Sequence, residues 1–168
     1  FSTRPFVGAR YSPRFAIGKY KGHRNADGRL VSWSGADITT NRNLVEFMND
    51  ARLSRSNRFT VTPYHIYRDI VMLYKAALRN LDSQTALGYV SRATIADWSA
   101  FNGYNPVWQT GNLNDLPTLF TGNKPISVNN FVDGTSPLNT EITSFMGIED
   151  IFGHIWEFLA GLNINYTN

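Results

Sequence analysis

The sequence contains no cysteine. This absence excludes disulfide bonds, thiolate zinc sites and cysteine nucleophiles. The sequence also lacks a run of about 18 apolar residues, which a membrane-spanning helix needs, and it does not open with a basic segment followed by an apolar stretch. We therefore expect no insertion into a membrane.

The 168 residues that are present suit one globular domain, because 42% of them are hydrophobic and 14% are aromatic. Residues 1–14 hold two prolines and three arginines without a clear period, which predicts an extended arm or linker. The domain should then cover residues 15–168. Because the chain begins with Phe1, we expect it to be a fragment of a longer protein.

The charges are distributed unevenly along the chain. Through Arg92 there are 15 basic and 6 acidic residues, whereas beyond it there are 1 and 7. The two halves can complement each other's charge, or the basic half can dock on an acidic partner surface. Nucleic acid is not an expected partner, because the basic residues are dispersed and match no nucleic-acid-binding signature.

The first half predicts a hairpin followed by two helices. Residues 15–20 are predicted as a strand, and Asn25–Gly28 as a turn leading into residues 30–33. Helical spacing predicts one helix over residues 42–53, capped by Thr39, Thr40 or Asn41, and a second over residues 63–78. Thr62 should cap the second helix and Pro63 should occupy its first position.

Enzymatic motifs are missing from the sequence. It has no nucleophile elbow, no phosphate-binding glycine loop and no metalloprotease helix, and its three histidines are widely spaced. Glu149, Asp150 and Glu157 are the carboxylates that a glycosidase would have to use, but adjacent residues on a regular element do not face each other. We expect no catalytic residues, no metal, no cofactor and no enzymatic activity.

A ligand-binding segment is predicted where aromatic and amide side chains alternate with turn residues. Aromatic faces stack on sugars or on protein surfaces, and amides satisfy hydroxyl or backbone groups. The alternative is that two or more of these rings fill the core beneath the loops. The candidate ligand-binding residues are Trp98, Phe101, Asn102, Tyr104, Asn105, Trp108, Gln109 and Asn112.

The segment from Gly147 to Phe158, followed by Gly161–Ile164, resembles a signature of phage structural proteins. It is also similar to the Gly-Asn-Val-Trp-Glu-Trp stretch of the formylglycine-generating-enzyme (sulfatase-modifying-factor) domain. Residues 80–89 resemble a run that follows the second helix in those phage proteins, and residues 15–22 and the order of the helices fit as well.

This resemblance implies an α+β domain with the C-type-lectin-like fold of the formylglycine-generating-enzyme type, in which two helices pack on twisted, mostly antiparallel sheets. Trp156 should then be a core residue, and Gly147, Gly153 and Gly161 should permit close approach or positive φ. His154 replaces the usual Asn of the family, so a bound calcium ion is not carried over. Oxidation of a sulfatase cysteine needs active-site cysteines, which this chain lacks.

The implied function is that of a non-catalytic virion domain on the phage particle surface. One alternative is a domain on a tail or head fibre that binds a host receptor or a glycan. A second is a capsid or tail decoration module that binds another virion subunit. A less favoured interpretation, outside the non-catalytic expectation, is a glycan depolymerase. The expected partners are a host surface glycan or protein, other virion proteins and further copies of the chain in a homo-oligomer.

Overall fold

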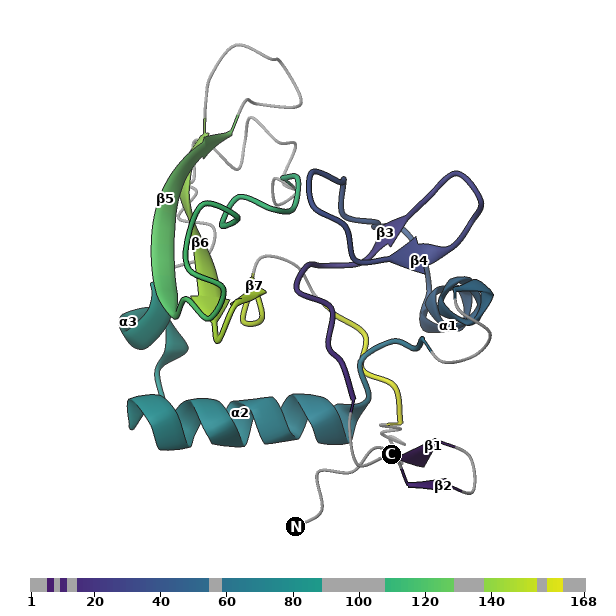
Figure 1. Cartoon of the computed structure of the whole chain (residues 1–168), viewed down its shortest axis with the longest axis horizontal. Coiled ribbons are helices and arrows are strands. Elements are labelled where there is room, and N and C mark those ends of the chain that lie inside the picture. Colours follow the sequence, from purple (N-terminus) through teal and green to yellow (C-terminus); the bar gives the residue numbers. More distant parts are fainter. Residues whose placement is uncertain are drawn as a thin grey trace, which may run out of the picture.

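The computed structural model describes residues 6–7, 10–11, 15–54, 59–88, 108–128, 138–153 and 157–161. In that part the chain has the predicted α+β class, with helices and small antiparallel sheets (Figure 1). Its elements are β1 (Phe6–Val7), β2 (Arg10–Tyr11), β3 (His23–Arg24), β4 (Leu30–Val31), α1 (Leu44–Leu53), α2 (Tyr64–Leu78), α3 (Ser83–Leu87), β5 (Gly122–Val128), β6 (Leu138–Phe145) and β7 (Ile148–Glu149).

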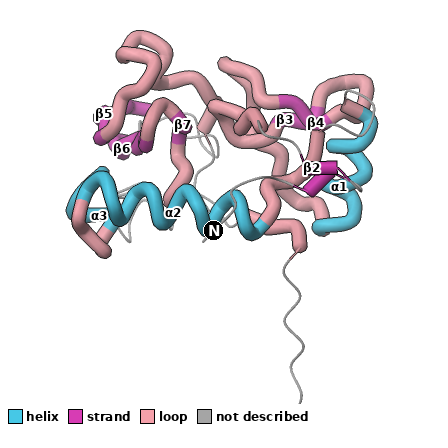
Figure 2. The backbone as a smooth tube through the Cα atoms, turned by 60° about the horizontal axis from the view of Figure 1, so that its bottom comes forward, coloured by secondary structure: helices cyan, strands magenta, loops and turns pink. Residues whose placement is uncertain are grey.

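The elements gather at two ends of the molecule. Strands β5, β6 and β7 form one antiparallel sheet in that order, with α3 beside it. Hairpin β3–β4 and helix α1 lie at the other end, and α2 runs along the lower edge in Figure 1. Figure 2 shows the same separation after rotation and shows how much of the connecting chain is loop. The pair β1–β2 falls within the predicted arm.

The tight turn between β6 and β7 depends on a glycine. Gly147 has a φ of +81°, and a Cβ atom there would lie 2.0 Å from the carbonyl oxygen of Thr118. Gly153 and Gly161 also have positive φ values, of 99° and 81°. The expectation for these three glycines is confirmed. Trp156, which was predicted to be a core residue, lies outside the described residues.

The predicted hairpin is present, but its first strand is not residues 15–20. The turn at Asn25–Gly28 joins β3 to β4, and Arg24 pairs with Leu30. Residues 15–20 form no strand, because their polar groups bind single partners instead of a ladder. The Tyr20 N–H donates to Ser32 Oγ at 3.0 Å, and the Lys19 carbonyl accepts from the Glu149 N–H at 2.8 Å.

Both predicted helices are confirmed, although their N-caps differ from the prediction. Asn43, rather than Thr39, Thr40 or Asn41, caps α1, because its side chain and that of Glu46 satisfy each other's backbone N–H groups.

Helix α2 begins at Tyr64, so Pro63 is its N-cap residue and not its first helical residue. No side chain caps this end. Instead, the Tyr64 N–H donates to the Ala160 carbonyl at 2.8 Å, and the Ala160 N–H donates to the Thr62 carbonyl at 3.0 Å. A strand-like contact with a distant segment therefore replaces the predicted cap at Thr62.

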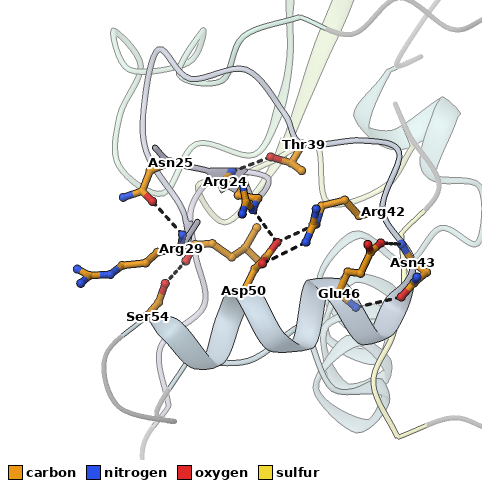
Figure 3. Close-up of polar contacts among 10 residues, drawn as sticks. Arg24, Asn25, Arg29, Thr39, Arg42, Asn43, Glu46, Asp50 and Ser54 are labelled. Atoms are coloured by element: carbon orange, nitrogen blue, oxygen red, sulfur yellow. Dashed lines mark hydrogen bonds and ion pairs between the residues drawn. The ribbon is translucent and has the colours of Figure 1, made fainter. Parts of the chain in front are cut away.

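A buried carboxylate fixes the hairpin to α1. Asp50 is 4% exposed and forms ion pairs with Arg24 from β3, at 3.2 Å, and with Arg42, at 2.8 Å (Figure 3). Ser54 at the end of α1 donates to the Leu30 carbonyl of β4 at 2.6 Å. These contacts join α1 and its C-terminal end to both strands of the hairpin.

Two apolar clusters form the described core. Helix α2 contributes Ile66, Ile70 and Tyr74 to the larger one, where the Tyr74 ring meets the ring of Phe145 edge-on at 5.8 Å. The smaller cluster consists of Trp108, Leu113 and Ile142, with Leu116 and Ile126 packed against it. The Trp108 ring therefore packs residues 108–116 against strand β6.

Candidate functional site

Two loops meet above the smaller core cluster. Residues 33–37 follow β4, and residues 109–114 follow Trp108; together we call them the polar platform. The Gly35 N–H donates to the Thr110 carbonyl at 2.8 Å, and the Thr110 N–H donates to the Ala36 carbonyl at 3.0 Å. The Thr110 hydroxyl also donates to the Trp33 carbonyl at 2.5 Å. The two loops are thus held together by hydrogen bonds to their main-chain groups, which fix the backbone that carries the surface side chains.

One edge of the platform presents an exposed aromatic ring beside polar groups. Trp33 is 54% exposed, and its ring centroid lies 6.3 Å from that of His23. His23 Nδ1 lies 2.8 Å from the Asp37 carbonyl, so this nitrogen carries the hydrogen. Gln109 Nε2 donates to the Asp37 carboxylate at 3.1 Å. These pairwise contacts therefore connect four residues into one surface: Trp33, His23, Asp37 and Gln109.

The other edge is a network centred on Asn114. Its Oδ1 accepts from Lys19 Nζ at 3.2 Å and from the Tyr20 hydroxyl, and its Nδ2 donates to Ser34 Oγ at 2.5 Å. Lys19 Nζ also lies 5.3 Å from the centre of the Tyr20 ring. Residues from three separate segments thus share one exposed polar surface, on which amide, hydroxyl and ammonium groups alternate.

Buried acidic side chains support the platform from below. Glu149 is 4% exposed, and its carboxylate accepts from the N–H groups of Gly111 at 2.9 Å and Leu113 at 3.3 Å. Burial raises the pKa of Glu149. Asp150 is 1% exposed and accepts from the Thr143 N–H at 3.2 Å and from the Trp108 indole N–H at 3.4 Å. Both carboxylates therefore bind the segment that begins at Trp108, and Asp150 also binds strand β6.

Lys21 completes this buried charge cluster. It forms an ion pair with Glu157, and its side chain is 9% exposed. Burial lowers the pKa of Lys21 to about 8, although the nearby negative charge of Asp150 acts in the opposite direction. Glu149 and Asp150 are buried, whereas the Glu157 side chain is 29% exposed, and each of the three carboxylates has a partner within the chain. These contacts give the carboxylates a structural role.

We expect the unfolding free energy to rise by about 1.5 kcal/mol between pH 8 and pH 9.5 because of Lys21. In this window the unfolded lysine keeps its proton, whereas the folded one, with a pKa of about 8, loses it. The folded state therefore gains stability as the pH rises. The measurement is urea unfolding at both pH values.

Lys21→Met is the matched control, and its stability should change much less over the same range. The window ends at pH 9.5 because burial also raises the pKa values of Tyr67 and Tyr74, whose ionisation in the unfolded chain favours unfolding at higher pH. Equal slopes for the two proteins would show that Lys21 is not the titrating group.

The structure corrects one of the predicted ligand-binding residues. Trp108 is 1% exposed, so it cannot stack on a ligand, and the alternative that a ring of this segment fills the core is confirmed for it. Gln109 and Asn112 do lie on the platform, where Asn112 Nδ2 donates to the Gln109 carbonyl at 2.5 Å. The other predicted residues, Trp98, Phe101, Asn102, Tyr104 and Asn105, lie outside the described residues.

Trp33 and Asp37 are not among the predicted binding residues, because residues 30–33 are predicted as a strand and residues 34–37 hold no aromatic or amide side chain. A signal was present: Trp33 is followed by Ser34 and Gly35, a turn composition that places a large ring next to a bend. The partners from residues 109–114 could not be found this way, because the two segments are far apart in the sequence.

Within the part of the chain that the structure describes, no helix is long and apolar enough to cross a membrane, and no group of three His, Asp or Glu side chains could hold a metal ion. Comparisons with family models, curated proteins and solved structures found no match to this chain.

Proposed function

We propose that this chain is a non-catalytic binding domain on the surface of a phage virion, and that the polar platform contacts a host receptor or glycan. The observation that carries the proposal is Trp33, a large ring that is 54% exposed on a backbone fixed by hydrogen bonds to residue 110. A ring on a fixed backbone has only two side-chain torsions to order when a ligand stacks on it, so the loss of conformational entropy is small.

The polar groups beside Trp33 suit a sugar or a peptide. The Asp37 carboxylate accepts hydrogen bonds, and the Gln109 amide both donates and accepts them. Because these side chains already hold each other, they can offer hydrogen bonds to hydroxyl or backbone groups without first being ordered. A flat ring next to such groups is the arrangement that orients a ligand with one apolar face.

The virion location and the finer fold rest on the sequence resemblance. We propose a C-type-lectin-like domain of the formylglycine-generating-enzyme type on a tail or head fibre, as part of a homo-oligomer. The order of the two helices and the positive φ values of Gly147, Gly153 and Gly161 are compatible with this proposal. On such a scaffold the function lies in the surface residues and not in the fold.

Replacing Trp33 by Ala should weaken ligand binding by about 1–3 kcal/mol, the range of a contact hot spot, while leaving thermal unfolding nearly unchanged. Binding would be measured on an array of immobilised bacterial surface polysaccharides, with wild type and variant at equal concentration. The indole is lost from the surface only, so the fold should persist.

Leu119→Ala is the matched control, because Leu119 is also exposed, at 70%, but belongs to neither loop of the platform. It should bind every polysaccharide as the wild type does. If Trp33→Ala retained full binding to a polysaccharide that the wild type recognises, the platform would not be the contact surface. A folded wild type that binds none would favour the assembly alternative.

A further inference from the structure

Lys19 is a positioned cation at one edge of the polar platform. Its Nζ donates to Asn114 Oδ1 at 3.2 Å and lies 5.3 Å from the centre of the Tyr20 ring. The residue is half-buried, and its carbonyl accepts from the Glu149 N–H at 2.8 Å. The ammonium group is therefore held in place, so that little side-chain entropy is lost when a ligand binds it.

The charge of Lys19 is not neutralised by an ion pair. Lys124 pairs with Asp115 at 2.7 Å, but no ion pair between described residues involves Lys19. Glu149 is near enough for the charge of Lys19 to oppose the rise in its pKa, but its carboxylate is buried and binds main-chain N–H groups. An ammonium group has three N–H donors, and Asn114 uses one of them. Two donors therefore remain for a negatively charged ligand group.

The other edge of the platform carries the opposite charge. Asp37 is exposed, and its carboxylate accepts from Gln109 Nε2 but forms no ion pair with a described residue. An ionised carboxylate only accepts hydrogen bonds, so it suits the hydroxyl groups of a sugar and repels a phosphate or a second carboxylate. The negative group of an acidic ligand should therefore lie at Lys19, and its hydroxyl groups at Asp37.

Trp33 connects the two edges. On one side it adjoins Ser34, whose Oγ accepts from Asn114 Nδ2 at 2.5 Å, and this amide also binds the ammonium group. On the other side its ring lies 6.3 Å from that of His23, which binds the Asp37 carbonyl. The exposed ring is thus flanked by a hydrogen-bonded path to a cation and by another to a carboxylate.

We propose, on the basis of the function proposed above, that the ligand of the platform is an acidic polysaccharide whose sugars carry carboxylates. A sugar ring stacks on Trp33, its hydroxyl groups bind Asp37, and a carboxylate on the same or the next sugar binds Lys19. The net charge of +3 also favours the encounter with a polyanion. Single-stranded nucleic acid could stack on the ring as well, but its phosphates would be repelled by Asp37.

The test uses the array of immobilised bacterial surface polysaccharides before and after chemical reduction of their carboxyl groups, which converts carboxylates into uncharged primary alcohols. We expect the polysaccharides that bind the wild type to carry carboxylates, and their binding to fall at least about tenfold after reduction, because a charged hydrogen bond is lost. Lys19→Met should weaken binding to the native forms by a similar factor and leave binding to the reduced forms unchanged. Lys19→Arg, which keeps the charge, should restore most of the binding.

Lys75→Met is the matched control, because Lys75 is an exposed lysine on α2 and belongs to neither loop of the platform. It should bind both forms as the wild type does, whereas Trp33→Ala should weaken both forms, since stacking does not depend on the carboxylate. Thermal unfolding of each variant would show that a loss of binding is not a loss of folding.

The outcomes separate this inference from the function on which it rests. If reduction left wild-type binding unchanged while Trp33→Ala weakened it, the platform would be a glycan site and the acidic ligand would be wrong. Equal weakening by Lys19→Met and Lys75→Met would also overturn the inference, because net charge and not the site would be responsible. The same holds if single-stranded DNA bound through Lys19 in preference to every polysaccharide. A wild type that binds no polysaccharide would overturn both the proposed function and this inference.

Discussion

Replacing Trp108 by Ala is expected to lower the unfolding free energy by about 3–5 kcal/mol, which is the usual cost of truncating a large core aromatic residue. Trp108 is 1% exposed and packs with Leu113 and Ile142, and its indole N–H donates to Asp150. The substitution would open a cavity under the platform and leave a buried carboxylate with fewer donors. Urea unfolding monitored by circular dichroism measures the change.

The comparison protein for this experiment is Trp33→Ala, which removes the same side chain from an exposed position. Its unfolding free energy should differ from that of the wild type by no more than about 0.5 kcal/mol. If Trp108→Ala were as stable as Trp33→Ala, residues 108–116 would not be packed on the core as described, and the support for the platform would be lost.

Replacing Asp50 by Ala should cost about 3 kcal/mol, because it leaves two arginines without the carboxylate that neutralises them. Asp50 is 4% exposed, whereas the side chains of Arg24 and Arg42 are 42% and 25% exposed, so water recovers part of the loss. The substitution should also loosen the hairpin, because Arg24 belongs to β3 (Figure 3). Hydrogen exchange of the β3 and β4 amides would report this loosening.

Asp27→Ala is the control for charge, since Asp27 is exposed and lies in the hairpin turn. It should leave the unfolding free energy and the hydrogen exchange of the β3 and β4 amides nearly unchanged. An Asp50→Ala protein with wild-type stability would mean that the ion pairs of Asp50 do not hold α1 to the hairpin, and that the Ser54–Leu30 hydrogen bond and apolar contacts are sufficient.

Helices were the features that could be predicted best from the sequence. Apolar residues at intervals of three and four located α1 and α2 almost to the residue, because the buried stripe of a helix is visible in a local window. Their N-caps were predicted less well. The Tyr64 N–H is satisfied by Ala160, almost a hundred residues away, and no local pattern contains such a partner.

The strand predicted at residues 15–20 failed for a related reason. A short run of apolar and aromatic residues favours a strand but does not provide a neighbouring strand for it, and here the main-chain groups of Lys19 and Tyr20 bind one side chain, that of Ser32, and one N–H group, that of Glu149. Strand β3 is only two residues long and carries His23 and Arg24, which have no strong strand preference.

The candidate site was located only in part. Gln109 and Asn112 were predicted and lie on the platform, but Trp108 is buried, and the exposed ring beside these residues is Trp33, which was not among the predicted binding residues. Composition cannot tell which of two tryptophans is buried, because burial depends on which segment lies above it. The loop that contains Trp33 is what the structure adds to the predicted binding segment.

The most direct test of the platform is to follow the indole N–H signals of the four tryptophans by NMR while a polysaccharide that binds on the array is titrated into the protein. Single Trp→Phe variants would assign the signals. We predict that the Trp33 signal shifts as the site fills, while that of Trp108, which is buried against Asp150, changes little. A Trp33 signal that stays unchanged when binding is saturated would contradict the proposed site.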